Sequence, residues 1–333
     1  MQNVKKMDLI TPFLGYRLDC YRHALLPAVR YFKRDFRPFF FLNHGNFAFN
    51  GKLSFEEMQF CEYRDILMNI GINREYSVVS DNTLILQICD KIEKDKIVIV
   101  FIDTYYYSKF PSSYLKFHSR HGIPVFGYNL IEKTFDVIDS NYIESFDRVK
   151  TTITFDELLY AHSNMVNHYD MHDYIEIIVD GDVKNSSFFY DYIEKYQNFY
   201  VEKKDIFEKS LADFKNFVNF YRDSLCNDDA IKSMVGSIYN VFNRVINLRH
   251  LEYTAFKKCF KDVNAALNCL EELVSLYNYV RAIAYKYLYS EEYRKESFER
   301  CGYAIEKIFK LEKHYYEIMC INNLNKHIVK LEV

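Results

Sequence analysis

Three residues of the kinds that make up cysteine-dependent active sites lie in the first half of the chain: Cys20, His121 and Asp139. Cys20 stands where a loop turns into an apolar-faced helix, and the partial positive charge at a helix N-terminus favours thiolate over thiol. The thiolate is the nucleophilic form of cysteine, which needs a histidine as base and an acid to orient the ring. The chain order of cysteine, histidine and aspartate therefore predicts a thiol nucleophile with its base and orienting acid.

Each assignment has a competitor. His118 competes with His121 as the base, and Asp136 or Asn141 could orient the ring in place of Asp139. The cysteine itself could be a small hydrophobic packing residue, as most buried cysteines are.

The helix at Cys20 contains Pro27, which removes a backbone hydrogen bond if it lies beyond the first turn. We therefore expect this helix to be kinked or to start late.

Two neighbouring strands must carry the histidine and the acid. Residues 123–128 and 134–138 are apolar segments joined by a short turn, which predicts a hairpin. Residues 97–102 form an uninterrupted β-branched run, typical of a strand buried on both faces.

Polar residues around the end of the strand 97–102 are candidates for substrate binding. They are Asp103, Tyr105 and Tyr106, together with His118. A simple polar strand end would account for the same residues.

Capping residues and the pattern of apolar residues predict the remaining helices and strands of the first half of the chain. Ser54 and Glu57 form a capping-box pattern that predicts a helix over 53–70, ended by Gly71. Further expected elements are a strand over 76–79, a helix from Asp81 to Ile92, a helix opened by Thr154 and Glu157, and a strand over 174–179.

The second half has few turn-forming residues. All five prolines precede residue 125, and only three of the nine glycines follow residue 130. From about residue 186 the pattern predicts four or five amphipathic helices packed as a bundle. The expected fold class is α+β, with a papain-like Cys-His-Asp domain over 1–185 and a helical domain over 186–333.

Composition narrows the function classes. A net charge of −3 gives no electrostatic reason to expect nucleic acid or an anionic membrane as a partner. Neither a signal peptide nor a membrane-spanning run of roughly 18 apolar residues is evident, so we expect a cytoplasmic protein. The eight cysteines form no C-x-x-C pair, which argues against disulfides and structural zinc.

A histidine cluster looks at first like a metal site. It comprises His162, His168 and His172 with Asp170 and Asp173. The segment lacks the glutamate of an H-E-x-x-H motif and is turn-like, so we expect a solvated loop and no metal.

Several of these segments together resemble the butirosin biosynthesis protein H family, over about residues 15–165. They are Asp19-Cys20, Asp103-Thr104-Tyr105-Tyr106, His118-x-x-His121 through Gly127-Tyr128, and Val137-Ile138-Asp139. Members are papain-like acyltransferases and relatives found with carrier-protein pathways of bacterial secondary metabolism. The chain departs from the family pattern at Pro124, inside a strand, and at Asn129, where an aspartate is common.

The resemblance implies Cys20 as nucleophile, His121 as base and Asp139 as orienter. It also implies an acyl group that arrives as a phosphopantetheine thioester on an acyl or peptidyl carrier protein, with no bound cofactor, and leaves to a small-molecule or peptide amine. No glutamine precedes Cys20 at the papain spacing, so the oxyanion would be bound by the Cys20 backbone N–H and another group. The oligomeric state is left open, a homodimer included.

Two other functions fit the same residues. One is a cysteine peptidase or amidase of the bacteriocin-processing type. The other is a catalytically silent protein that binds a carrier or synthetase domain.

Overall fold

The computed structural model describes residues 2–13, 19–111, 113–140, 148–169, 174–185, 187–321 and 324–329. It is a mixed α+β structure, as predicted. The chain divides into two units: unit 1 is Met1–Phe36 with Tyr63–Ser186, and unit 2 is Arg37–Glu62 with Ser187–Val333. Each unit has its own fold and is described separately.

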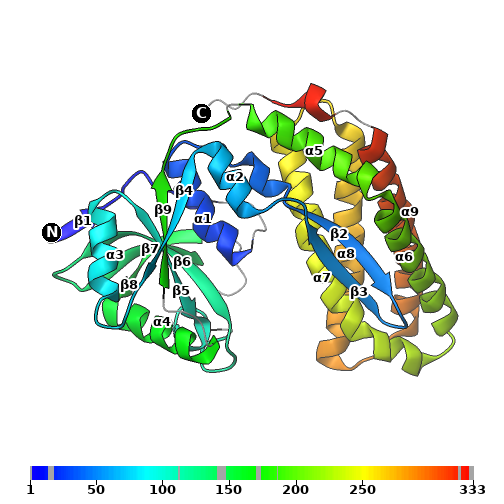
Figure 1. The fold of residues 1–333 in the computed structure, drawn as a ribbon. Helices are drawn as coiled ribbons and strands as arrows, with labels where there is room; N and C mark the ends of the chain where they lie inside the picture. Colours follow the sequence, from blue (N-terminus) through cyan, green and yellow to red (C-terminus); the bar gives the residue numbers. More distant parts are fainter. Residues whose placement is uncertain are drawn as a thin grey trace. The chain divides into compact units, whose positions relative to one another are not determined.

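Unit 1 is built on an antiparallel sheet in the strand order β4, β9, β5, β6, β7, β8, with β1 also paired to β6. The strands are β1 (Val4–Lys6), β4 (Ile72–Val78), β5 (Ile97–Asp103), β6 (Arg120–Asn129), β7 (Thr134–Ser140), β8 (Arg148–Thr154) and β9 (Tyr174–Asp180). The predicted hairpin is confirmed as β6 and β7, and every residue of β5 is buried. Figure 1 shows β5 and β6 in the middle of this sheet.

Two helices pack their apolar residues against one face of the sheet, α3 (Leu84–Glu93) and α4 (Phe155–Tyr169). Their buried side chains, Ile88 and Leu158 among them, join Val98, Val100 and Val125 in one core. The predicted cap of α4 is confirmed, because Thr154 Oγ1 accepts a hydrogen bond from the Glu157 N–H at 3.1 Å. Helix α3 begins at Leu84, later than the expected start at Asp81.

The helix that carries the cysteine, α1 (Cys20–Tyr31), packs against β5 and β6. Tyr21 stacks on Phe101, whose side chain points away from the core shared with α3 and α4. The helix begins at Cys20 itself and continues through Pro27, so the expected late start is wrong. A short helix, α2 (Tyr63–Ile70), and the 3₁₀ turn η2 (Thr104–Tyr106) complete unit 1.

One predicted helix is wrong over its first half. Residues Leu53–Gln59 form strand β3, and only Tyr63–Ile70 is helical. Leu53 and Phe55 are buried while Ser54 and Glu56 are exposed, a period of two that suits a strand with one buried face. The Ser54 hydroxyl therefore does not cap a helix and instead donates to the Ala48 carbonyl across the hairpin.

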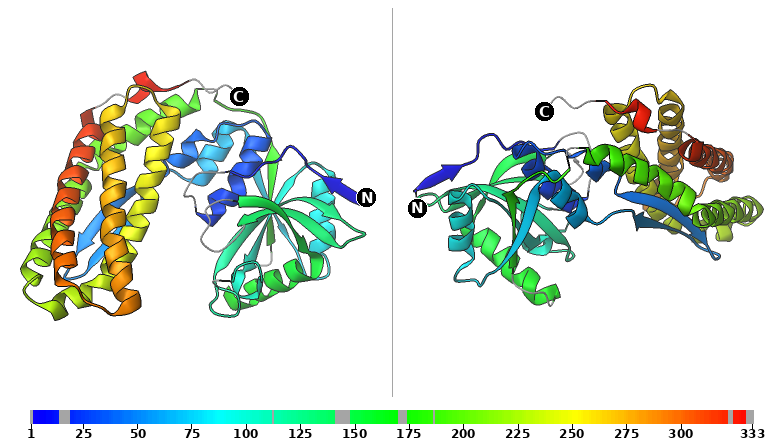
Figure 2. Two further views of the ribbon diagram at one scale, coloured as in Figure 1. Left: turned by 180° about the vertical axis from the view of Figure 1, so that it is seen from behind. Right: turned by 45° about the horizontal axis from the view of Figure 1, so that its top comes forward.

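Unit 2 is a helical bundle with that hairpin packed on it. Its helices are α5 (Phe188–Glu202), α6 (Lys204–Ser224), α7 (Asp228–Cys259), α8 (Asn264–Ser290) and α9 (Lys295–Ile321), with 3₁₀ turns η1 (Arg37–Phe40) and η3 (Leu324–His327). The three long helices α7, α8 and α9 lie side by side in both views of Figure 2. The predicted run of helices after residue 186 is thus confirmed.

The hairpin explains why unit 2 takes in a segment from the first half of the sequence. Strand β2 (Asn43–Phe49) pairs with β3, and Phe47 stacks on Phe214 of α6 at a ring separation of 4.4 Å. The expected division at 185/186 therefore needs a correction: residues 37–62 belong with the helices, because their aromatic side chains are buried against them.

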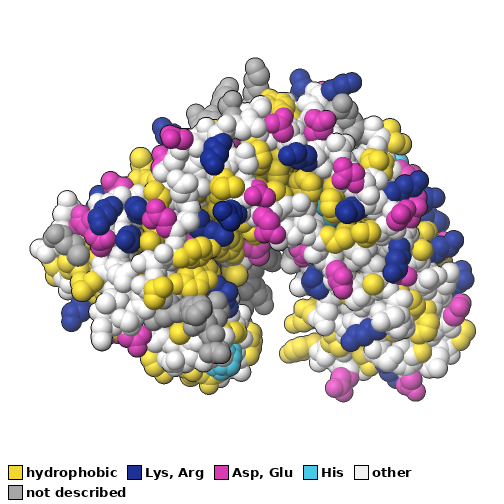
Figure 3. All heavy atoms as spheres, viewed as in Figure 1, with side chains coloured by type: hydrophobic (Ala, Val, Ile, Leu, Met, Phe, Trp, Pro, Cys, Tyr) yellow, Lys and Arg dark blue, Asp and Glu magenta, His cyan; other side chains and the backbone are white. Residues whose placement is uncertain are grey.

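The surface carries mixed charge. On the face shown in Figure 3, lysine and arginine are interspersed with aspartate and glutamate. None of the helices, within the described residues, is long and apolar enough to cross a membrane.

Candidate functional site

Cys20 is the first residue of α1, and local hydrogen bonds place it there. The Asp19 carboxylate caps the helix by accepting from the Arg22 N–H at 2.7 Å, and it also pairs with the Arg22 side chain at 2.6 Å. The His23 N–H donates to the Asp19 carbonyl at 3.0 Å. Cys20 itself is half-buried and in no disulfide, and it stands at the positive end of the helix.

The sheet brings His121 and Asp139 together from the neighbouring strands β6 and β7. His121 Nε2 lies 2.9 Å from Asp139 Oδ1, and both side chains are almost fully buried. His121 also interacts with Cys20, and this interaction raises the pKa of the imidazole and lowers that of the thiol. The carboxylate thus orients the imidazole, and the imidazole acts on the sulfur.

The electrostatics of this site favour an ion pair. Burial by itself raises the pKa of the Cys20 thiol, but the hydrogen bond and charge of His121 outweigh it and the pKa is lowered. Burial likewise lowers the pKa of His121, and the charge of Asp139 more than compensates, giving a pKa of about 9. Both shifts favour a thiolate next to an imidazolium over the neutral pair.

Three further groups at this site were not found by sequence reasoning. The backbone of Gly122 also lowers the pKa of the Cys20 thiol. Arg148, at the start of β8, donates from Nη1 to Asp139 Oδ1 at 2.9 Å. His23 is buried close by, and burial together with the charge of Arg148 lowers its pKa to about 3. No motif marks Arg148; only the pairing of β7 with β8 brings it to Asp139.

A second polar network holds the residue that follows the cysteine. The Tyr21 hydroxyl donates to Glu176 Oε1 at 2.6 Å and accepts from Arg74 Nη1 at 3.0 Å. Glu176 is buried, and that burial raises the pKa of its carboxyl. These bonds fix the first turn of α1 on the sheet. They come from β4 and β9, whereas Asp139 lies in β7, on the other side of β5 and β6.

The predicted substrate-binding residues form a cluster of their own. His118 Nδ1 lies 2.5 Å from Asp103 Oδ2, and its ring stacks on Tyr105 at 4.4 Å. Tyr106 packs edge-on against Tyr105, and His168 of α4 stacks on His118 at 3.7 Å. His118 is therefore paired with Asp103, whereas His121 is the histidine that pairs with Asp139 and lowers the pKa of Cys20.

The candidates for the orienting acid are distinguished by their partners. Asp136 pairs with Lys6 at 3.1 Å, whereas Asp139 bonds the ring of His121. Asn141 lies outside the described residues. Asp139 is thus the acid that contacts the imidazole.

The histidine cluster around α4 differs in part from the expected solvated loop. His162 is buried in α4, with Nδ1 2.7 Å from the Phe101 carbonyl oxygen, so that expectation is wrong for this residue. His168 is also helical, as the next-to-last residue of α4, whereas Asp170, His172 and Asp173 lie outside the described residues. Across the described ranges no three histidine, cysteine or acidic side chains group as a metal site would.

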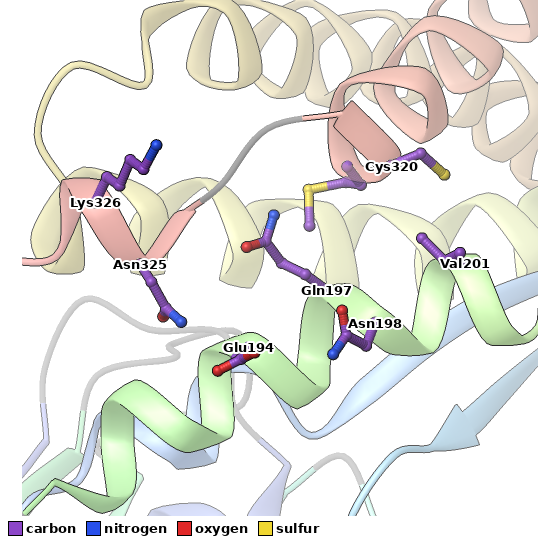
Figure 4. Close-up of a pocket in the computed structure, with 8 residues that line it drawn as sticks. Glu194, Gln197, Asn198, Val201, Cys320, Asn325 and Lys326 are labelled. Atoms are coloured by element: carbon purple, nitrogen blue, oxygen red, sulfur yellow. The ribbon is translucent and has the colours of Figure 1, made fainter.

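Unit 2 has a hollow of about 420 Å³ with a mostly polar lining. Figure 4 shows side chains of α5, α9 and η3 around it, including Gln197, Cys320 and Lys326. The Gln197 side-chain oxygen accepts a hydrogen bond from the Leu324 N–H at 2.8 Å. This hollow holds no cysteine–histidine pair among its lining residues.

Comparison with known proteins adds no family assignment: no protein-family model and no curated protein matches this chain.

Proposed function

We propose that this protein is a cysteine-dependent acyltransferase that uses Cys20 as nucleophile, His121 as acid and base, and Asp139 as the orienting acid. The observation that carries the proposal is the pairing of His121 with Asp139 at 2.9 Å, together with the interaction of His121 with Cys20, the first residue of a helix. The helix on one face of an antiparallel sheet, with the histidine and acid on adjacent strands, supports a papain-like fold. These features agree with the resemblance to the butirosin biosynthesis protein H family.

The first half-reaction loads the enzyme. The Cys20 thiolate attacks the carbonyl carbon of a thioester, a carbon–sulfur bond to Cys20 forms, and the bond to the donor sulfur breaks. The departing thiolate takes the proton held on His121. The products are an acyl-enzyme and a neutral imidazole that remains bonded to Asp139.

The second half-reaction transfers the acyl group. His121 accepts a proton from the acceptor amine as the amine nitrogen attacks the acyl carbon, and the bond to Cys20 breaks. This restores the thiolate and the imidazolium. Water in place of the amine gives hydrolysis, so exclusion of water decides between transfer and an amidase or peptidase activity.

The backbone around Cys20 supplies a donor for the oxyanion. Helix N-termini leave their first N–H groups without intrahelical partners. Asp19 takes the N–H groups of Arg22 and His23, whereas the Cys20 N–H has no acceptor within the described residues. That N–H is available to the developing negative charge of a tetrahedral intermediate.

The donor that suits this chemistry is an acyl or peptidyl carrier protein with its acyl group on phosphopantetheine, in bacterial secondary metabolism. Thioester exchange is nearly isoenergetic, so a thiol enzyme can load from such a donor without another energy source. The eight free cysteines support a reducing compartment such as the cytoplasm.

The test is detection of the acyl-enzyme. The protein is incubated with a panel of acyl-pantetheine thioesters, and intact mass followed by peptide mapping locates the adduct. We expect one acyl group on Cys20, none in Cys20→Ala, and full loading in Cys226→Ala, which removes an exposed cysteine of unit 2. An unchanged adduct mass in Cys20→Ala, or labelling spread evenly over the exposed cysteines, would rule out Cys20 as the nucleophile.

A further inference from the structure

A separate pocket of about 370 Å³ lies in unit 1 between helix α2 and strand β4. Its lining is Arg64, Leu67, Met68, Ile72, Asn73, Arg74 and Tyr76. The floor is apolar, because Leu67 and Ile72 are buried. The rim carries two guanidinium groups, one amide and one phenol ring, and no acidic side chain lines it.

The two arginines differ in how their charge is balanced. Arg64 is exposed and has no ion pair with any carboxylate in the described part of the chain. Arg74 is partly balanced by Glu176, at 3.6 Å, and its guanidinium lies 5.3 Å from the centre of the Tyr76 ring. The pocket therefore has an excess of positive charge above an apolar floor, a combination that suits an anion carried on a partly apolar chain.

Arg74 connects this pocket to the candidate nucleophile. Its Nη1 donates to the Tyr21 hydroxyl at 3.0 Å, and Tyr21 follows Cys20 directly in α1. The pocket is thus separated from Cys20 by one tyrosine side chain and one hydrogen bond. Tyr21 therefore stands between an anionic group bound at the arginines and the sulfur of Cys20.

We propose that this pocket binds the anionic end of the acyl donor, a phosphate or carboxylate separated by an extended chain from the acyl group that reaches Cys20. This inference rests on the proposed acyl transfer, in which the donor must present its reacting carbon to Cys20. Arg64 supplies the uncompensated charge. Arg74 contacts the anion and holds Tyr21 in place.

Binding is tested without turnover, in the Cys20→Ala variant of the full-length chain. The probes are S-alkyl thioethers of phosphopantetheine and of pantetheine, and a peptide acid with its amide. Isothermal titration measures their Kd. We expect the phosphorylated thioether to bind about tenfold more tightly than the unphosphorylated one, with the difference lost in Arg64→Gln and kept in Arg300→Gln, an exposed arginine of α9.

The outcomes distinguish a phosphate from a carboxylate as the bound anion. They also distinguish failure of the anion site from failure of the proposed acyl transfer. A preference for the peptide acid over its amide that depends on Arg64 also supports the site, with a carboxylate as its ligand. Equal Kd values within both probe pairs, or equal effects of Arg64→Gln and Arg300→Gln, would overturn the anion site. Either result leaves the acyl-enzyme on Cys20 to be judged by the mass measurement alone.

Discussion

Arg148 and His121 bond the same carboxylate oxygen: Arg148 Nη1 and His121 Nε2 each lie 2.9 Å from Asp139 Oδ1. Two cations thus share one anion in a buried site. The charge of Arg148 lowers the pKa of His121, while its attraction to Cys20 favours the thiolate. The charge of Arg148 therefore lowers the pKa of His121 and also that of Cys20.

Removal of Arg148 should move the pH profile of Cys20 reactivity as a whole. In Arg148→Met the thiolate loses an attractive charge and the imidazolium loses a repulsive one, so both pKa values rise. We expect both limbs of the bell-shaped dependence of kcat/KM to shift upward by about 1 pH unit. The measurement is acyl-enzyme formation from acyl-pantetheine between pH 5 and 10.

Arg148→Lys is the matched control, since it keeps the positive charge. Its profile should stay close to that of the wild-type protein, and circular dichroism establishes that both variants are folded. A shift toward acid pH in Arg148→Met would contradict the assignment of Arg148.

Removal of the imidazole should make Cys20 an ordinary buried thiol. In His121→Gln, burial, the charge of Asp19 and the Gly122 backbone remain, and both burial and Asp19 raise the pKa of the thiol. We expect alkylation by iodoacetamide at pH 7 to slow by about tenfold or more, because each unit of pKa changes the thiolate fraction tenfold. Peptide mass spectrometry measures the rate at Cys20.

The exposed Cys226 of unit 2 provides an internal reference in the same sample. Its alkylation rate should be equal in the two proteins. Equal rates at Cys20 as well would show that His121 does not activate the thiol.

His44 of β2 should make unit 2 sensitive to acid. It is fully buried, stacks on Tyr196 and Phe199 at 4.5 Å each, and neither ring nitrogen has a hydrogen-bond partner in the described structure. Burial lowers its pKa well below the ordinary value. Below about pH 6.5 the unfolded chain takes up a proton that the folded chain does not. The free energy of unfolding therefore decreases as the pH is lowered.

His44→Phe removes both the proton uptake and two buried nitrogens without partners. We expect the free energy of unfolding to rise by about 1 kcal/mol at pH 7 and by more at pH 5. Urea unfolding followed by circular dichroism at the two pH values measures this difference. His314→Phe, at an exposed position of α9, should leave the acid dependence unchanged; a gain in His44→Phe that is the same at both pH values would contradict the titration of His44.

Arg249 should be essential to the stability of the bundle. Its guanidinium makes two bonds to Glu312, at 3.0 and 2.6 Å, and one to Glu252 at 2.6 Å, all buried. Arg249→Met leaves two buried carboxyl groups without their cation, which costs about 3–5 kcal/mol. Urea unfolding monitored by helical circular dichroism measures the loss.

Arg281→Met is the comparison, since Arg281 donates to the neutral side chain of Asn243 at 2.9 Å and forms no ion pair within the described residues. We expect it to cost about 1 kcal/mol. Similar losses in the two variants would show that the Arg249 network contributes no more than an ordinary hydrogen bond.

Local patterns in the sequence were enough for many elements and for part of the candidate site. The expected boundary between loop and helix at Cys20 is where α1 begins, although the late start inferred from Pro27 is wrong. The β-branched run at 97–102 and the apolar segments at 123–128 and 134–138 became β5, β6 and β7. The adjacency of the strands carrying His121 and Asp139 followed from the short turn between them.

The tertiary structure decided what depends on distant partners. Residues 53–59 suit a helix by their capping pattern, yet pairing with β2 and packing on α7 make them a strand, because packing outweighs weak local propensities. His118 and His121 are equivalent in local sequence, and the register of β5, β6 and β7 assigns one to Asp103 and the other to Asp139.

The charged partners were decided in the same way. Arg148 meets Asp139 across the pairing of β7 with β8, and Arg74 of β4 meets Tyr21 of α1; no local spacing encodes either contact. The sequence by itself determined which residue types were available and which stretches would be helix or strand where the local pattern was strong. Only the fold decided which of those side chains share a buried, low-dielectric site, and their pKa values follow from that burial and those neighbours.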